Sequence, residues 1–157
     1  MGPKIIKKDS FQLIGYRLST NLKEINEHDI IHHAATRLKE KSIYIHNKVR
    51  DKLLILQIYP MKEEFNPVDE NFNVIVGYEV NNAEDTPENT VLFTVESNMY
   101  VNCKHNGSRT DLYKTYDFLY NDWLQKNRCT PLGFEMEVWN EKSDSEVEVC
   151  IPITKYM

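Results

Sequence analysis

The sequence predicts an α+β fold made of two pseudo-symmetric β-α-β-β units, with an antiparallel sheet and two helices on one side of it. Seven segments show the two-residue hydrophobic alternation of strands, and two show the period of amphipathic helices. The order strand, helix, strand, strand occurs twice, and corresponding elements lie about 75 to 80 residues apart. This order leaves either the other face of the sheet or the groove between the halves free for a ligand.

The strands follow from the positions where hydrophobic and polar residues alternate. They are predicted near Phe11 to Thr20, Lys52 to Tyr59, Phe72 to Val80, Thr90 to Val95, Met99 to Lys104, Phe134 to Trp139 and Val147 to Ile153. The fourth of these joins the two units.

The two helices interrupt the strands at corresponding points. The first is predicted from about Glu27 to Lys41, with an apolar stripe of Ile30, Ile31, Ala34, Ala35 and Leu38. The second is predicted from about Thr110 to Lys126, with a broad apolar face of Leu112, Tyr116, Leu119, Tyr120, Trp123 and Leu124.

Polar segments that favour turns separate these elements. Asn81 to Asn89 is predicted to connect the halves, and Asn140 to Ser145 to connect the last two strands. Met61 to Glu70 is a loop long enough to act as a lid. We therefore predict a single domain over residues 1–157, with a first unit of about residues 4–82 and a second of about residues 90–157.

The composition favours a folded domain that binds neither nucleic acids nor membranes directly. The chain has 157 residues, 41% of them hydrophobic, which is enough for one core. Its net charge of -5 argues against broad contact with phosphates, and the basic stretches Lys4 to Lys8 and Arg37 to Lys41 are interpreted as solvated faces. The three cysteines are widely spaced, and no apolar run approaches the roughly 20 residues that span a bilayer. We expect a cytoplasmic protein.

The most informative segment is the strand from Phe134 to Trp139. Its alternation sends Glu135, Glu137 and Trp139 to one face and only apolar residues to the other. Two interpretations are open, because the acidic face either contacts water or lines a pocket. Such a pocket suits a flat, greasy cation, since carboxylates pair with cations and aromatic faces attract them.

Three further residues are candidates for binding the same ligand. Tyr59 ends a strand just before the possible lid, which suits a wall residue. Trp123 lies in the apolar stripe of the second helix, so it either packs in the core or forms the floor of a cavity. Glu79 is out of phase with its apolar neighbours and is either a second acid or a solvated residue near the end of a strand.

A metal site is the alternative function that His28 and His32 raise, because they have the i,i+4 spacing of a zinc signature. Asp29 replaces the glutamate of that signature, the pair lies on the polar stripe, and the sequence offers no apparent third ligand. We expect neither a metal nor a cofactor.

Several short motifs occur in order along nearly the whole chain. They are Phe11 to Gly15, Phe72 to Val80, Tyr100 to Gly107, Thr115-Tyr116 with Trp123-Leu124, and Glu146 to Ile153. Together they resemble the GyrI-like family, also known as the AraC-type effector-binding domain family. The resemblance implies a pseudo-symmetric domain with a small-molecule site in the groove between its units. Many members sense drugs as parts of DNA-binding regulators, and a few hydrolyse strained cyclopropane-bearing natural products.

The chain differs from the regulator pattern in two places. Nothing before Phe11 matches a helix-turn-helix, so we expect no direct binding to DNA. Glu137-Val138-Trp139 replaces the Glu-x-Tyr usual in the family, which keeps an acid and an aromatic ring but removes the phenol.

Three functions are open at this point. The first is a binding module that senses or sequesters amphipathic, cationic or aromatic compounds, with a DNA-binding regulator as a possible protein partner. The second is a hydrolase in which Glu137 is the general acid or base. The third is a standalone interaction protein that inhibits gyrase through its acidic surface. In each case we expect a monomer or a weak dimer.

Overall fold

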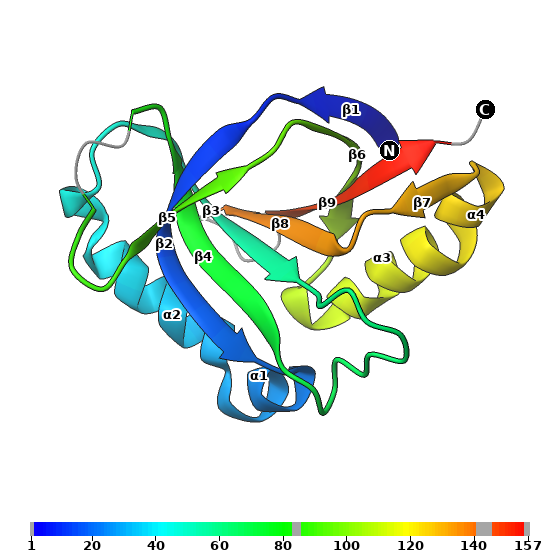
Figure 1. Cartoon of the computed structure of the whole chain (residues 1–157), viewed down its shortest axis with the longest axis horizontal. Helices are drawn as coiled ribbons and strands as arrows, with labels where there is room; N and C mark the ends of the chain where they lie inside the picture. The colour runs from blue at the N-terminus through cyan, green and yellow to red at the C-terminus, as the bar shows by residue number, and fades with distance from the viewer. Residues whose placement is uncertain (1, 83–85, 141–145, 156–157) are drawn as a thin grey trace.

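The computed structural model describes residues 2–82, 86–140 and 146–155 (Figure 1). Part of the connection predicted over Asn81 to Asn89, and most of the one over Asn140 to Ser145, lies outside these residues. Within the described residues the fold is α+β, as predicted, and its strands form one antiparallel sheet.

Nine strands make up this sheet in the described part of the chain. They are β1 (Lys4–Lys8), β2 (Phe11–Thr20), β3 (Lys48–Ile58), β4 (Phe72–Val80), β5 (Val91–Val95), β6 (Asn98–Asn106), β7 (Cys129–Pro131), β8 (Phe134–Asn140) and β9 (Glu146–Lys155). The order across the sheet is β1-β6-β9-β8-β3-β4-β2-β5, and β7 pairs with β9. All seven predicted strands are present, and β2 and β4 have the predicted bounds.

The sequence analysis missed two strands, β1 and β7. The segment Lys4 to Lys8, interpreted as a solvated face, is an edge strand that pairs with β6, and its Lys4 and Lys7 are exposed. Its lysines are typical of edge strands, where charge discourages pairing with other chains. The three residues of β7 are too few to show an alternation.

The helices lie where the periodicity predicted, with one correction. They are α1 (Leu22–His28), α2 (Ile30–Glu40), α3 (Leu112–Phe118) and α4 (Leu124–Lys126), and a π-helical segment, η3 (Leu119–Trp123), connects the last two. Short 3-10 turns occupy η1 (Ser42–Tyr44) and η2 (Arg109–Asp111). Among the described residues, none of these helices has the length and apolar composition of a membrane-crossing segment.

The single helix predicted over Glu27 to Lys41 was wrong at its start, because two helices occupy this region. Asp29 has a left-handed backbone, with φ 52° and ψ 41°, which ends α1 and precedes α2. The first helix begins earlier because Asn21 caps it, its side chain accepting a hydrogen bond from the backbone N–H of Glu24 at 2.9 Å.

Removing this cap tests whether α1 depends on it. We expect Asn21→Ala to lower the free energy of unfolding by about 1 kcal/mol, because a donor at the helix start loses its acceptor. Urea unfolding followed by circular dichroism measures the loss. Asn21→Asp keeps the acceptor and should retain most of the stability, so an equal loss in both variants would contradict a capping role.

The sheet has approximate two-fold symmetry about the pair β3 and β8. On one side of this pair the order is β4-β2-β5, and on the other it is β9-β6-β1. The ladder pairs residues 52–58 with residues 134–140, so its midpoint is the pair Ile55 and Glu137. The edge strands are exchanged. β1 lies at the start of the first unit but pairs with β6 of the second, and β5 lies at the start of the second unit but pairs with β2 of the first. This exchange interlocks the two units.

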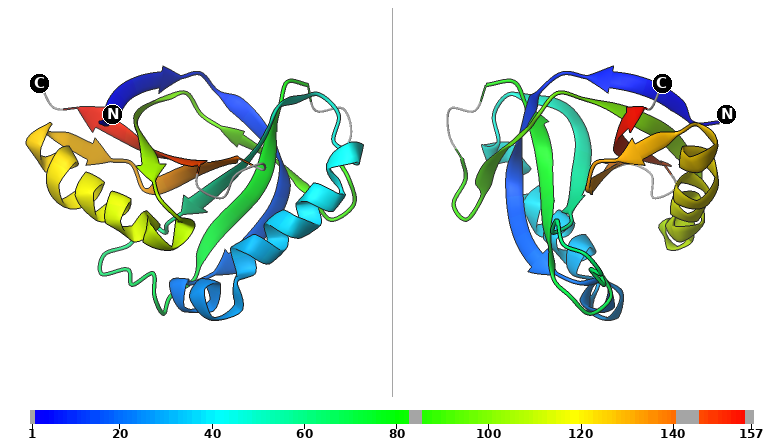
Figure 2. Two further views of the ribbon diagram at one scale, coloured as in Figure 1. Left: turned by 180° about the vertical axis from the view of Figure 1, so that it is seen from behind. Right: turned by 45° about the vertical axis from the view of Figure 1, so that its right-hand side comes forward.

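Hydrophobic clusters cover both faces of the sheet. In the first half α2 packs on β3 and β4, and in the second half η3 and α4 pack on β6 and β9. Figures 1 and 2 show the helices of both halves on the same side of the strongly curved sheet, as predicted. A third cluster fills the opposite face, with Leu54, Leu56, Ile75 and Met136 among its members. The symmetry axis therefore meets the helix-bearing face between the two sets of helices, at Glu137.

Candidate ligand-binding site

The acidic strand occupies the centre of the sheet on its helix-bearing face. Glu137 pairs with Ile55, and Glu135 and Trp139 lie two residues away on either side. The side chains between them belong to the hydrophobic cluster on the opposite face. The structure thus brings both carboxylates and the indole together, with the alternation that the sequence predicted.

The carboxylate of Glu137 is buried, with 5% of the residue exposed. It accepts hydrogen bonds from the hydroxyl of Tyr116 at 2.6 Å, the indole N–H of Trp139 at 2.9 Å and the side-chain amide of Gln57 at 3.2 Å. Burial raises the pKa of Glu137, while the bonds from Tyr116 and Trp139 oppose that rise.

Glu135 is held in a similar way by two phenols. Its carboxylate accepts hydrogen bonds from the hydroxyl of Tyr120 at 2.8 Å and from that of Tyr59 at 2.9 Å. Burial raises the pKa of Glu135 to about 7, and the nearby charge of Glu137 adds to the increase. The two hydrogen bonds oppose it. This carboxyl group therefore titrates close to neutral pH.

The charge of these carboxylates is not neutralised by direct ion pairing. In the described residues, neither Glu135 nor Glu137 forms a salt bridge. The phenols remain protonated donors, because burial and the adjacent carboxylates raise the pKa values of Tyr59, Tyr116 and Tyr120. Buried carboxylates whose hydrogen bonds come from neutral donors retain a strong attraction for a cation.

Helix periodicity places two of the phenols. Tyr116 and Tyr120 are four residues apart, so they lie on one helix face, and their rings stack with centroids 6.5 Å apart and planes inclined by 19°. Tyr120 belongs to the π-helical segment η3. Such segments occur often at functional sites.

The third phenol belongs to an aromatic cluster at the other end of the site. The ring of Tyr59 lies 5.0 Å from that of Phe72 and 6.0 Å from that of Phe65, measured between centroids. Phe65 belongs to the loop that was predicted as a lid. That loop is attached to α1, because the backbone N–H of Leu22 donates to the carbonyl of Pro67 at 2.8 Å. The loop therefore connects Tyr59 with the start of the first helix.

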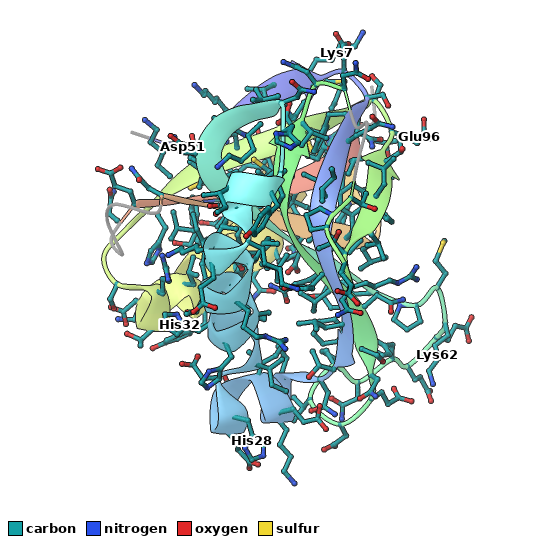
Figure 3. The ribbon with its side chains drawn as sticks, turned by 90° about the vertical axis from the view of Figure 1, so that its left-hand side faces the viewer. Lys7, His28, His32, Asp51, Lys62 and Glu96 are labelled. Atoms are coloured by element: carbon teal, nitrogen blue, oxygen red, sulfur yellow. The ribbon has the colours of Figure 1, made fainter. Side chains whose placement is uncertain are left out.

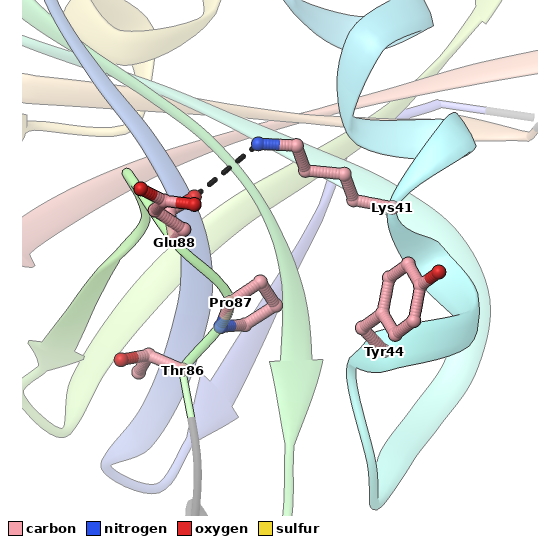
Figure 4. A pocket seen from close by; sticks show the side chains of 5 residues that line it. All are labelled: Lys41, Tyr44, Thr86, Pro87 and Glu88. Carbon is pink, nitrogen blue, oxygen red and sulfur yellow. Dashed lines mark hydrogen bonds between the residues drawn. The ribbon is translucent and has the colours of Figure 1, made fainter.

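The tyrosine side chains cover the carboxylates. Two surface pockets of the described residues lie elsewhere and include neither Glu135 nor Glu137. One, of about 410 Å³, is lined by Lys41, Tyr44, Thr86, Pro87 and Glu88 (Figure 4). The other, of about 300 Å³, is lined by Lys52, Lys104, His105, Asn106, Val138, Asn140, Glu146, Val147 and Glu148.

Two of the predicted candidates lie outside this cluster. Trp123 packs with the hydrophobic cluster between the second set of helices and the sheet, which matches the core alternative. Glu79 faces the other side of the sheet, as its pairing with Leu13 shows, and its carboxylate lies 3.2 Å from the ammonium of Lys8 and 3.8 Å from the guanidinium of Arg50. Glu79 is thus separated from the acids on β8 by the thickness of the sheet.

The histidine pair does not have the geometry of the zinc signature. His28 belongs to α1 and His32 to α2, and the left-handed Asp29 separates the two helices (Figure 3). The premise that both histidines share one helix face was therefore wrong.

Sequence analysis identified Tyr59 and Trp139 as site residues but missed the other donors to the carboxylates, Tyr116, Tyr120 and Gln57. The apolar stripe of the second helix directed Tyr116 and Tyr120 toward the sheet, but it gave no partner for their hydroxyls. Gln57 has the same strand phase as Tyr59, which was the available signal for placing it at the site.

The fold is that of effector-binding domains. The profile of the Cass2 family, described as integron-associated effector binding protein, matches residues 4–153. The chain belongs to this family, and its fold agrees with the GyrI-like resemblance of the sequence. A comparison with curated protein sequences gives no match.

Solved structures with little sequence identity share the fold. SAV2435 bound to tetraphenylphosphonium superposes with a TM-score of 0.70 at 13% identity, over 98% of this chain and 94% of that one. The EcmrR C-terminal domain gives 0.71 at 13% identity, over 98% of both chains. The integron cassette protein VCH_CASS2 from Vibrio cholerae gives 0.65 at 19% identity, over 98% of this chain and 97% of that one.

Proposed function

We propose that this protein binds amphipathic cations that carry aromatic groups, and that Glu135, Glu137, Trp139 and Tyr59 form the binding site. The observation that carries the proposal is a pair of buried carboxylates held by three phenols, an indole and one side-chain amide, without a salt bridge in the described residues. The structure of SAV2435 with tetraphenylphosphonium supports this ligand class, since that protein shares the fold.

When a cation binds, it replaces neutral hydrogen-bond donors beside the two carboxylates. The phenols of Tyr116 and Tyr120 rotate away, their rings remain beside the ligand, and the carboxylates approach the cation. The cation supplies the opposite charge that attracts the buried carboxylates, while the aromatic rings replace water around its apolar surface. The proposed biological role is the sensing or sequestration of such cations.

The pH dependence of binding tests the proposal. A bound cation favours the ionised form of Glu135, so binding releases the proton that this group holds below its pKa of about 7. We expect the affinity for tetraphenylphosphonium to rise by up to about tenfold per pH unit below pH 7 and to level off above it. Isothermal titration calorimetry between pH 5.5 and 8.5 measures this, and buffers of different ionisation enthalpy count the protons released.

Triphenylphosphine oxide is the control ligand, because it is neutral and carries three phenyl groups on phosphorus where the cation carries four. Its binding should be weak and independent of pH. Equal affinity for both compounds, or an affinity for the cation that falls as the pH rises, would refute the proposed role of the carboxylates.

A further inference from the structure

Arg109 lies on the aromatic face that a cationic ligand would use. It begins η2, the 3-10 turn that leads from β6 into α3. The central carbon of its guanidinium group lies 3.9 Å from the centre of the Trp139 ring. This distance is well within the range of a cation–π interaction.

The turn before Arg109 is fixed by a buried histidine. His105 is 5% exposed, and its Nδ1 and Nε2 lie 2.6 Å from the hydroxyl of Thr115 and 2.7 Å from the carbonyl oxygen of Ser108. One ring therefore connects the end of β6, the turn and α3. These contacts hold the backbone of Arg109 beside the indole.

Both the N–H and the ring face of Trp139 already have partners in this structure. Its N–H donates to Glu137 at 2.9 Å, its ring carries the guanidinium group, and only 8% of the residue is exposed. The positive charge of Arg109 also opposes the burial-driven rise in the pKa of Glu137. The guanidinium group of Arg109, which is covalently attached to the protein, thus supplies a weaker form of the positive charge that a bound ligand would supply.

We infer that Arg109 is a specificity-determining residue of the proposed binding site, a tethered cation that an incoming ligand displaces from Trp139. A ligand has to bind the indole better than a guanidinium group already held there. Arg109 therefore selects large aromatic cations with delocalised charge over small ammonium compounds. This inference depends on the proposed function, because it concerns ligands of the same site.

The test compares Arg109→Gln with Arg109→Lys and with Lys114→Gln. The first variant removes the tethered charge, and the second keeps a cation on a side chain that stacks less well. The third removes an exposed charge on α3, where Lys114 pairs with Asp111 at 3.6 Å. All three are made in a Trp123→Phe background, so that Trp139 is the single tryptophan and its fluorescence reports ligand contact. The ligands are tetraphenylphosphonium, tetramethylammonium and neutral triphenylphosphine oxide.

We expect Arg109→Gln to bind tetraphenylphosphonium about 3- to 30-fold more tightly, the range of a partly desolvated cation–π contact. The relative gain for tetramethylammonium should be larger. The neutral oxide should gain less than the cations, because only a cation is also relieved of repulsion by the guanidinium charge. Arg109→Lys should fall between wild type and Arg109→Gln, and Lys114→Gln should match wild type. An unchanged or weaker affinity in Arg109→Gln, or an equal gain for the neutral oxide, would overturn the inference.

The outcomes separate this inference from the proposed function. If tetraphenylphosphonium binding requires Glu137 but is unaffected by Arg109→Gln, the binding function stands and the displacement of Arg109 is wrong. If neither wild type nor Arg109→Gln binds any of the cations, both ideas fail. A loss of folding in Arg109→Gln is detected by its melting temperature, and Arg109→Lys then provides the decisive comparison with wild type.

Discussion

Glu137→Gln is expected to lower the affinity for tetraphenylphosphonium by about 30-fold or more. Removing one charge of a desolvated pair costs about 2–5 kcal/mol, and Glu137 lies at the centre of the proposed site. Tyr116 and Trp139 donate to different oxygens of Glu137. Glutamine keeps one oxygen to accept from Trp139, and its amide can donate to the hydroxyl of Tyr116, so the variant should fold. The affinity is measured by calorimetry at pH 8, where Glu135 is ionised.

Glu79→Gln is the comparison that makes this result specific. Glu79 is another shielded glutamate of the same sheet, but it lies on the opposite face and pairs with Lys8. Its substitution changes the net charge by the same amount and should leave the affinity unchanged. If both variants lose binding equally, the effect comes from overall charge, and if neither does, the ligand does not contact Glu137.

The position of the acids on β8 could be predicted because strand alternation is a local property. One face of Phe134 to Trp139 is apolar, and a shift of one residue would bury the acids in the cluster on the opposite face. The stripe of the second helix was equally local, and it directed Tyr116 and Tyr120 toward the sheet. Whether their hydroxyls reach a carboxylate depends on the distance between helix and sheet, which no local pattern contains.

Non-local pairing explains what the sequence did not show. The first strand pairs with β6 of the other unit, so nothing near Lys4 to Lys8 in the chain identifies its partner. This pairing brings Lys8 to Glu79, which converts a candidate ligand acid into a member of an ion pair. The contact of Arg109 with Trp139 likewise joins two segments about thirty residues apart.

The symmetry of the fold is broken at the site. The axis through the midpoint of the β3–β8 ladder relates Leu53, Ile55 and Gln57 to Glu135, Glu137 and Trp139. The backbone thus provides two equivalent positions for each side chain, but only the second unit places acids there. The first unit supplies apolar residues and the amide of Gln57. A single cation with apolar groups suits this asymmetry, because the side chains of the second unit are anionic and most of those of the first unit are apolar.

Gly15→Ala is expected to have the largest effect on stability. Gly15 pairs with Gly77 where β2 crosses β4, and a Cβ added to Gly15 would lie 1.8 Å from the carbonyl oxygen of Val76 and 2.5 Å from the Cα of Gly77. Both atoms belong to the backbone of a central strand, so the clash cannot be relieved by rotating a side chain. The two strands would have to separate and lose ladder hydrogen bonds. We expect a loss of about 3 kcal/mol or more, a large part of the 5–15 kcal/mol that stabilises a typical domain.

Two other glycines give a graded comparison for this prediction. A Cβ on Gly77 would lie 2.9 Å from the carbonyl oxygen of Ile14, a milder clash, and a Cβ on Gly2 would meet nothing within 4 Å. Urea unfolding should therefore rank Gly2→Ala with wild type, Gly77→Ala below it and Gly15→Ala lowest, or unfolded without denaturant. A Gly15→Ala protein with the wild-type midpoint would mean that β2 and β4 do not approach so closely. Because β4 pairs with β3, which in turn pairs with the acidic strand β8, the same variant should also lose tetraphenylphosphonium binding, whereas Gly2→Ala should retain it.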